Sequence, residues 1–268
     1  MSRNGPLALA YHALFVTFTL APIVVVCWVA FTPEGFLSFP TGAWSLRWFR
    51  AIARYPEFVA AFWRSLGLGA LSSLLAVGFS LPAALAIARH RFAGREAISA
   101  LFMSPLMIPS VVLGIAFLRF FTQVGLGGAF MGLVLAHIVI VMPFALRLTL
   151  ASAAGLDRAL EHAAISLGAS EATVLRRIIL PLILPGLVSG WALAFINSFD
   201  EVTMTVFVAG PGSETLPVRM FLSIQDNIDP LVTSVSACVI ALTVLALVAL
   251  DRAYGLERLL VGRGNDGR

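Results

Sequence analysis

The amino-acid sequence predicts an all-α membrane protein with six transmembrane helices, and three observations support that prediction. Apolar residues make up 59% of the 268 residues, charged residues make up 12%, and the mean hydropathy is +0.95. The charged residues leave six long uncharged windows between them, and all 18 basic residues are arginines with an uneven distribution. A soluble domain carries about 25% charged residues. The composition therefore excludes an ordinary soluble enzyme and a disordered chain.

The six uncharged windows locate the helices. They cover residues 4–33, 65–88, 97–118, 120–146, 178–199 and 230–250. A bilayer core about 30 Å thick needs roughly 20 helical residues, and each window is long enough. A barrel strand would alternate apolar and polar residues over about 10 positions, whereas these windows are continuously apolar. We therefore predict transmembrane helices at 8–31, 61–88, 97–121, 129–150, 182–209 and 231–251.

Individual features of these windows refine the prediction. The first apolar run is too long for the core of a signal peptide, and no small-residue cleavage site follows it, so we expect a retained helix. Pro105 and Pro109 are expected to kink the third helix. Cys27 and Cys238 both lie in apolar stretches, which indicates neither a disulfide framework nor a cysteine metal site.

Arginine placement predicts the orientation of the chain. With the N-terminus in the cytoplasm, the inner connections carry 12 arginines and the outer connections carry 6, while each side carries 7 acidic residues. The positive-inside rule therefore places both termini in the cytoplasm. The outer segment 32–60 is rich in Trp, Phe and Tyr, which favours a short helix at the membrane interface.

The inner segment 147–177 holds seven of the chain's charged residues. Within it, apolar and small residues recur at helical spacing, Gly168 interrupts the pattern, and Ser170 is placed to cap a second short helix. This pattern indicates a helix–Gly–helix unit exposed to the cytoplasm. The unit either rests on lipid or docks on a cytoplasmic partner. Small Ala163 and Ala164 would allow close approach by another backbone, which favours docking.

The stretch "EHAAISLGASEATVLRRIILP" at 161–181 resembles the EAA loop of bacterial ABC importer permeases. The alanine pair, Gly168 and the final "IILP" stand at the spacing of that motif. The acid usually stands directly before the alanines; here His162 holds that place and Glu161 stands one position earlier. By this resemblance, residues 155–178 form the cytoplasmic coupling-helix loop. Glu161, Ala163, Ala164 and Gly168 are its expected ATPase-docking residues.

Three further stretches, "SLRWF" (45–49), "LAHIVIVMPFALR" (135–147) and "SFDEVTMTVFVAGPGSETLPVRMF" (198–221), resemble the spermidine/putrescine (PotC-like) permease subfamily. The resemblance implies a type I ABC importer permease (MetI-like) fold and a single multi-pass permease domain over residues 1–268 in the bacterial inner membrane. It implies a polyamine as the solute and, as an alternative, another small solute such as an amino-acid-like compound or a phosphonate.

The resemblance also implies the partners of the chain. Apart from the lipid bilayer, these are a cytoplasmic ABC ATPase dimer, a second permease subunit in a heterodimer, and an extracytoplasmic solute-binding protein. No nucleic acid and no cofactor are implied. The sequence contains no GxxxxGK[ST] phosphate loop, so we expect ATP hydrolysis on a separate subunit. A secondary transporter would be expected to show internal repeats, and an intramembrane enzyme would need a catalytic constellation; neither is evident.

Asp200 and Glu201 are the only charges predicted inside a span that continues past them. A charge at that depth costs about 2.5–3.5 kcal/mol on insertion scales, so it normally faces a pore or a partner. Helical spacing would group Asn197, Glu201 and Met204 on one face. We therefore expect Asp200, Glu201, Asn197 and Met204 along the substrate path, with at least one carboxylate attracting a cation. The alternative is that both carboxylates support a subunit interface or an outer loop. His137 is expected to be a packed, hydrogen-bonded core residue.

Overall fold

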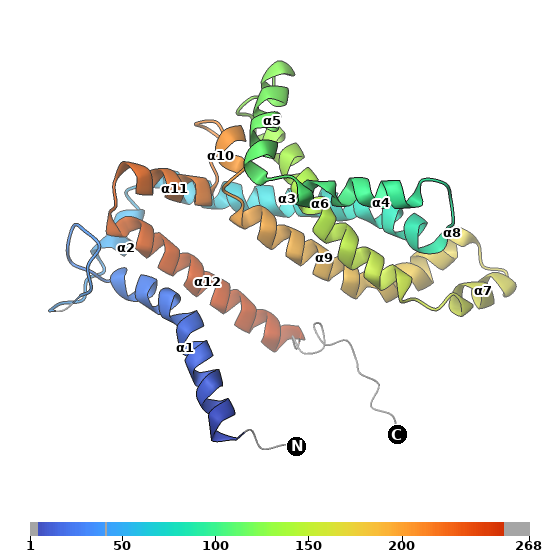
Figure 1. Ribbon diagram of the computed structural model, residues 1–268, viewed down its shortest axis with the longest axis horizontal. Coiled ribbons are helices and arrows are strands. Elements are labelled where there is room, and N and C mark those ends of the chain that lie inside the picture. The colour runs from blue at the N-terminus through green and yellow to red at the C-terminus, as the bar shows by residue number, and fades with distance from the viewer. Residues whose placement is uncertain (1–4, 41, 255–268) are drawn as a thin grey trace. The chain divides into compact units, whose positions relative to one another are not determined.

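The computed structural model describes residues 5–40 and 42–254, and in these ranges the chain forms helices and no β-strand. Figure 1 labels the α-helices in chain order. They are α1 (Pro6–Val29), α2 (Arg47–Ile52), α3 (Pro56–Arg89), α4 (Arg95–Met103), α5 (Ser110–Gln123), α6 (Phe130–Ala154), α7 (Ala159–Ser166), α8 (Glu171–Val174), α9 (Leu180–Asp200), α10 (Thr205–Val208), α11 (Leu216–Asp226) and α12 (Pro230–Tyr254). A 3₁₀ turn (Ser104–Met107) follows α4, and a π turn (Leu175–Ile179) joins α8 to α9.

Four continuous helical segments are long and apolar enough to cross a membrane: α1, α3, α6 and the run Glu171–Asp200. The pair formed by α4 with its 3₁₀ turn and α5 provides a fifth span if both halves count together. In α12 the apolar part of the helix is shorter and covers Pro230–Ala246. The number of six spans and the cytoplasmic location of both termini stay predictions. Reporter fusions at Gly212 and at Gly264 would test them; of these two positions, Gly264 lies outside the described residues.

The third predicted helix, 97–121, is not one straight helix. Its two halves meet at an angle of 101°. Ile108 is extended (φ −98°, ψ 128°), and Pro109 begins the turn into α5. A proline disfavours the helical conformation of the residue before it and offers no N–H of its own. The expected kink at Pro109 is therefore a complete break.

The fifth predicted helix, 182–209, is wrong at both ends. Helical structure begins earlier, at Glu171, and α9 ends at Asp200. Glu201 is extended (φ −71°, ψ 115°), and its Oε1 accepts a hydrogen bond from the backbone N–H of Met204 at 2.7 Å. In a continuing helix that N–H would bond the carbonyl of Asp200. The glutamate side chain has replaced the backbone acceptor, and the chain turns before α10.

By its contacts the chain divides into two compact units, residues 60–219 and the remainder. In the unit 60–219, α6 and α9 pack against each other along their lengths (Figure 1). Small residues allow this approach: a Cβ added at Gly186 would lie 2.3 Å from the Cβ of Ser152. Fully buried Leu133, Val134 and Met204 form the centre of the adjoining core.

The other unit contains α1, α2 and α12. Ser234 on α12 donates a hydrogen bond to the carbonyl of Ala30 at 3.1 Å, which fixes α12 beside the end of α1. Two aromatic residues of the segment 32–60 pack on this end: the ring centroids of Trp44 and Phe49 lie 5.3 Å and 5.0 Å from that of Phe31. The short helix expected in this segment is α2. The expectation of a single domain over 1–268 stays a prediction.

Candidate translocation cavity and coupling element

A cavity of about 200 Å³ lies where the third membrane segment is broken. Its lining comes from the 3₁₀ turn, α5, α6 and the end of α9. Seven of the lining side chains are apolar, and the three polar ones are Ser110, Asn197 and Glu201. Glu201 is the one ionisable group among the described residues of this lining. The site is therefore a small cavity among mostly apolar residues, with one carboxylate and two neutral polar side chains in its wall.

The structure separates the four residues expected along the path. Asn197 and Glu201 both line the cavity, although they do so from the last turn of α9 and the extended residue after it. Asp200 is exposed and lies outside the lining. Met204 is fully buried in the core beside Val208 and Leu133. The argument from a shared helical face is wrong, because the helix ends before Glu201.

A buried polar network fixes the chain where α9 ends, on both sides of Glu201. The ring of His137 on α6 lies with Nδ1 2.8 Å from the Ser198 hydroxyl and Nε2 3.0 Å from the Thr205 hydroxyl. All three side chains are buried. Ser198 belongs to the last turn of α9 and Thr205 begins α10, so His137 clamps the chain on both sides of Glu201. The prediction of a packed, hydrogen-bonded histidine is confirmed.

The candidate coupling loop, residues 155–178, which is called the coupling element below, follows α6 and has the predicted helix–Gly–helix form. Gly168 adopts a left-handed conformation (φ +86°) between α7 and α8. Its N–H bonds the carbonyl of Ile165 at 2.9 Å, and the N–H of Ala169 bonds that of Ala164 at 3.0 Å. These two bonds form a Schellman motif, which glycine favours because a β-carbon is strained at that φ. The Ser170 hydroxyl then caps α8 by accepting from the N–H of Thr173 at 3.3 Å.

The two alanines of the coupling element point in different directions. Ala164 is half-buried and packs on the cluster that contains Val174, Ile179 and Ile183. Ala163 is exposed, together with Leu160 and with Leu167, whose exposed fraction is 89%. Leu160, Ala163 and Leu167 recur at spacings of three and four residues and so lie on one side of α7 and its cap. We name these three residues the outer face of α7.

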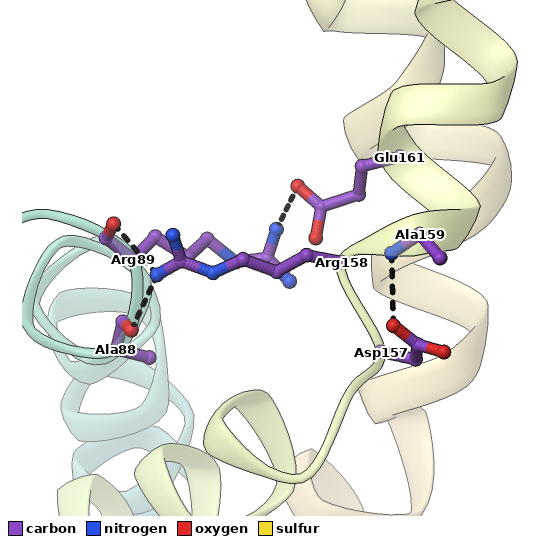
Figure 2. Close-up of polar contacts among 6 residues, drawn as sticks. All are labelled: Ala88, Arg89, Asp157, Arg158, Ala159 and Glu161. Carbon is purple, nitrogen blue, oxygen red and sulfur yellow. Dashed lines mark hydrogen bonds and ion pairs between the residues drawn. The ribbon is translucent and has the colours of Figure 1, made fainter.

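Glu161 points the other way, toward its own chain. Figure 2 shows its carboxylate paired with the guanidinium of Arg89 at the end of α3. In the same view, Nη2 of Arg158 donates to the carbonyls of Ala88 at 3.0 Å and Arg89 at 2.7 Å. Asp157, two residues before the start of α7, accepts a hydrogen bond from the N–H of Ala159 at 2.9 Å. Glu161, expected to dock the ATPase, therefore makes its ion pair within the chain.

Sequence analysis missed Arg89, Arg158 and the partners of His137. Arg89 ends a long apolar helix and Arg158 precedes α7, which were signals only of helix ends and of orientation. The bonds from Arg158 to the carbonyls of Ala88 and Arg89 join positions 70 and 69 residues apart, so no local pattern could reveal them. Within the described ranges, no three His, Cys, Asp or Glu side chains gather as a metal site would require.

The sequence matches the model of one transport family over the region that contains both sites. The family is described as "Binding-protein-dependent transport system inner membrane component", and the match covers residues 76–256, which include the cavity and the coupling element. The chain belongs to this family. It is a transport subunit of the inner membrane, and the expectation that it is not itself an enzyme is confirmed by that membership.

Two relatives and one solved structure place the permease further. The spermidine/putrescine transport system permease protein PotC of Haemophilus influenzae is 32% identical over 251 residues, which are 93% of this chain and 95% of that protein. The putrescine transport system permease protein PotI of Escherichia coli is 28% identical over 244 residues, which are 88% and 86% of the two chains. A chain in the crystal structure of a bacterial alginate ABC transporter, in complex with an alginate pentasaccharide-bound periplasmic protein, has a TM-score of 0.69 at 18% identity over 93% of each chain. The predicted type I ABC importer permease fold is thereby confirmed.

Proposed function

We propose that this permease is the membrane-spanning subunit of an ATP-driven importer for a small organic cation of the polyamine class. The observation that carries the proposal is the single carboxylate, Glu201, in the wall of a cavity whose other lining residues are uncharged and mostly apolar. The names of the relatives PotC and PotI support the same solute class. The expected partners are a cytoplasmic ATPase dimer, a second permease subunit and a solute-binding protein.

The position of Glu201 suits transient binding of an amine. One carboxylate oxygen is held by the Met204 N–H, so the side chain is oriented before any solute arrives. Coulomb energy scales inversely with effective dielectric, so an ammonium group is attracted more strongly in a cavity within the protein than in bulk water. One carboxylate supplies that attraction without a cage of several charges. A solute bound in this way is recognised and can still be released.

An amino-acid-like solute is the second candidate, and one observation favours it. Ser110, in the same lining, begins α5, and the start of a helix carries a partial positive charge that suits a carboxylate. A zwitterion could then place its amine toward Glu201 and its carboxylate toward α5. The apolar remainder of the lining suits a polyamine's methylene chain, which is why the polyamine is preferred.

Uptake by the complete transporter tests the solute assignment. In proteoliposomes with the ATPase, the second permease and the binding protein, Glu201→Gln is expected to slow uptake of labelled putrescine or spermidine. Asp200→Asn is the matched control, because this neighbouring carboxylate is exposed and outside the cavity lining. Equal uptake by the two variants would overturn the role of Glu201, and uptake of an amino acid but no polyamine would favour the second candidate.

We further propose that the outer face of α7 docks on the ATPase. Exposed leucines flanking a small alanine offer an apolar surface that another backbone can approach closely. Leu167→Asp is expected to reduce the amount of ATPase that co-purifies with the permease. Ser166→Asp is the control, since it adds the same charge one position away, where the hydroxyl bonds only its own helix at His162. Normal co-purification of Leu167→Asp would contradict docking at this face.

A further inference from the structure

The end of α3 is joined to the coupling element by two polar links that run in opposite directions. Arg158, just before α7, reaches the backbone of α3 at the carbonyls of Ala88 and Arg89. Arg89, in the last turn of α3, reaches back to Glu161 in the first turn of α7 (Figure 2). The last carbonyls of a helix have no partner within it and favour a cation. Arg158 therefore completes α3 while attaching it to α7.

The ion pair in this junction is shielded from water. The exposed fractions are 11% for the Arg89 side chain and 18% for that of Glu161. Removing one partner of a buried pair leaves an uncompensated charge, which is far more costly than losing a surface pair. A change of either residue alone is therefore expected to disturb the contact between α7 and α3.

Apolar packing alone does not join these elements. A cavity of about 490 Å³ lies between the end of α3 and the α7–α8 turn, with Leu85, Ile165 and Leu175 in its lining. Arg89, Arg158 and Glu161 line the same cavity. Leu81, Leu85 and Ala88 of α3 do pack on the cluster that contains Val174, Ile179 and Ile183, but the cavity leaves that contact incomplete, and the polar links add to it. Along the chain, α7 is continuous only with α6 and, through α8, with α9.

We propose that Arg89, Arg158 and Glu161 are positioning residues that make α3 move together with the coupling element during transport. This inference rests on the proposed docking of the outer face of α7 on the ATPase. Movement of α7 reaches α6 and α9 through the backbone, whereas it reaches α3 through side-chain contacts, and these three residues form the charged part of those contacts. Glu161 accordingly acts through α3, and the ATPase contact is made by the opposite side of the helix.

Charge exchange in the complete transporter tests the ion pair. Glu161→Arg and Arg89→Glu should each retain the bound ATPase while lowering uptake per ATP hydrolysed by about tenfold or more, within the range of typical coupling free energies. The double variant, with both changes, should recover most of that loss. Arg158→Gln should also uncouple uptake from hydrolysis, whereas Arg176→Gln, which removes an exposed arginine of the π turn, should not.

A distance measurement separates movement from folding. Spin labels at positions 86 and 165, on either side of the cavity in a background without Cys27 and Cys238, should keep one separation with and without ATP. In Glu161→Arg that separation should change with nucleotide. A separation that already changes in the unaltered pair would overturn the proposal, as would full coupling in both single variants.

The outcomes also distinguish this inference from the docking proposal. Loss of ATPase co-purification in Leu167→Asp concerns docking alone. If Glu161→Arg releases the ATPase, and the double variant with Arg89→Glu does not bind the ATPase again, Glu161 contacts the ATPase directly and the proposed link to α3 is wrong. Uncoupled hydrolysis with the ATPase still bound supports the link.

Discussion

Two junctions in the unit 60–219 hold helices together by different chemistry. Around the break at Glu201, His137 bonds two hydroxyl groups, and all three side chains are buried. At the end of α3, the contacts are an ion pair and charged hydrogen bonds, with exposed fractions of 11% and 18% for the paired side chains. Burying charge costs more than burying a hydrogen-bonded hydroxyl. Side chains that can stay neutral therefore form the contacts inside the apolar region, and charged side chains form the contacts where the chain leaves that region.

The difference also separates two mechanical tasks. The His137 network fixes the local path of one chain segment and thereby the direction of Glu201. The ionic junction connects two elements across a partly empty space, so it can pass on a displacement. The following variants are ordered by expected effect, and each tests one side of this contrast.

Gly168→Leu should have the largest effect, on the coupling side. The left-handed conformation at φ +86° costs a residue with a side chain roughly 1–2 kcal/mol, and the altered turn should misplace the outer face of α7 against the ATPase. Transport and ATPase stimulation should be abolished while membrane insertion is retained. Gly155→Ala is the control, because Gly155 has an ordinary φ of −78°. Normal coupling in Gly168→Leu would indicate that residues 155–178 only rest on lipid.

His137→Ala tests the buried side. It removes two hydrogen bonds and opens a void among buried groups, so we expect a loss of about 2–5 kcal/mol. Thermal unfolding of the purified permease measures this loss, and polyamine uptake should fall as the segment around Glu201 relaxes. His12→Ala, at an exposed position on α1, should change neither quantity appreciably. Equal stability of the two variants would show that the clamp contributes nothing.

Gly186→Ala tests the packing that supports both junctions. The new Cβ would lie 2.3 Å from that of Ser152, so the backbones of α6 and α9 must separate. Overpacking of this kind costs about 1–3 kcal/mol, measurable by thermal unfolding. Addition of Ser152→Gly should restore stability. Gly67→Ala is the control, since a Cβ there meets nothing within 4 Å, and an equal loss in that variant would contradict the packing argument.

Ser170→Ala should have the smallest effect. It removes the cap of α8, which is worth roughly 1 kcal/mol, so local hydrogen exchange in α8 should rise while global unfolding changes little. Ser166→Ala is a suitable control because its hydroxyl bonds a carbonyl within α7. If exchange in α8 is the same in both variants, the Ser170 hydroxyl does not stabilise that helix.

Local signals in the sequence predicted the coupling element well. Gly168 and Ser170 act through bonds within a few residues, so their roles could be inferred from spacing. The orientation of Glu161 could not, because it depends on Arg89, which lies far away in the sequence. The motif identified the right segment, and only the folded chain shows which side each residue occupies.

The end of α9 was beyond sequence reasoning for a related reason. The stretch "SFDEVTMTVFVA" contains neither glycine nor proline, so apolar content alone favoured a continuing helix. Its helix ends because the Glu201 side chain takes the Met204 N–H, and because His137 fixes Ser198 and Thr205 from a different helix. By contrast, the break before α5 has a local signal in Pro109. The sequence predicted a kink there, and the structure has a bend of 101°.

The 101° bend between α4 and α5 has a consequence for biogenesis. α5 has 14 residues, about 21 Å at 1.5 Å per residue, against a hydrocarbon core of about 30 Å. The preceding half has 9 residues in α4 and 4 in the 3₁₀ turn, so its length is similar to that of α5. Neither half can cross the bilayer alone, and the peptide groups at the break need protein around them. This segment therefore has to enter the membrane as a pair and reach its final shape only after α6 and α9, synthesised later, have arrived beside it.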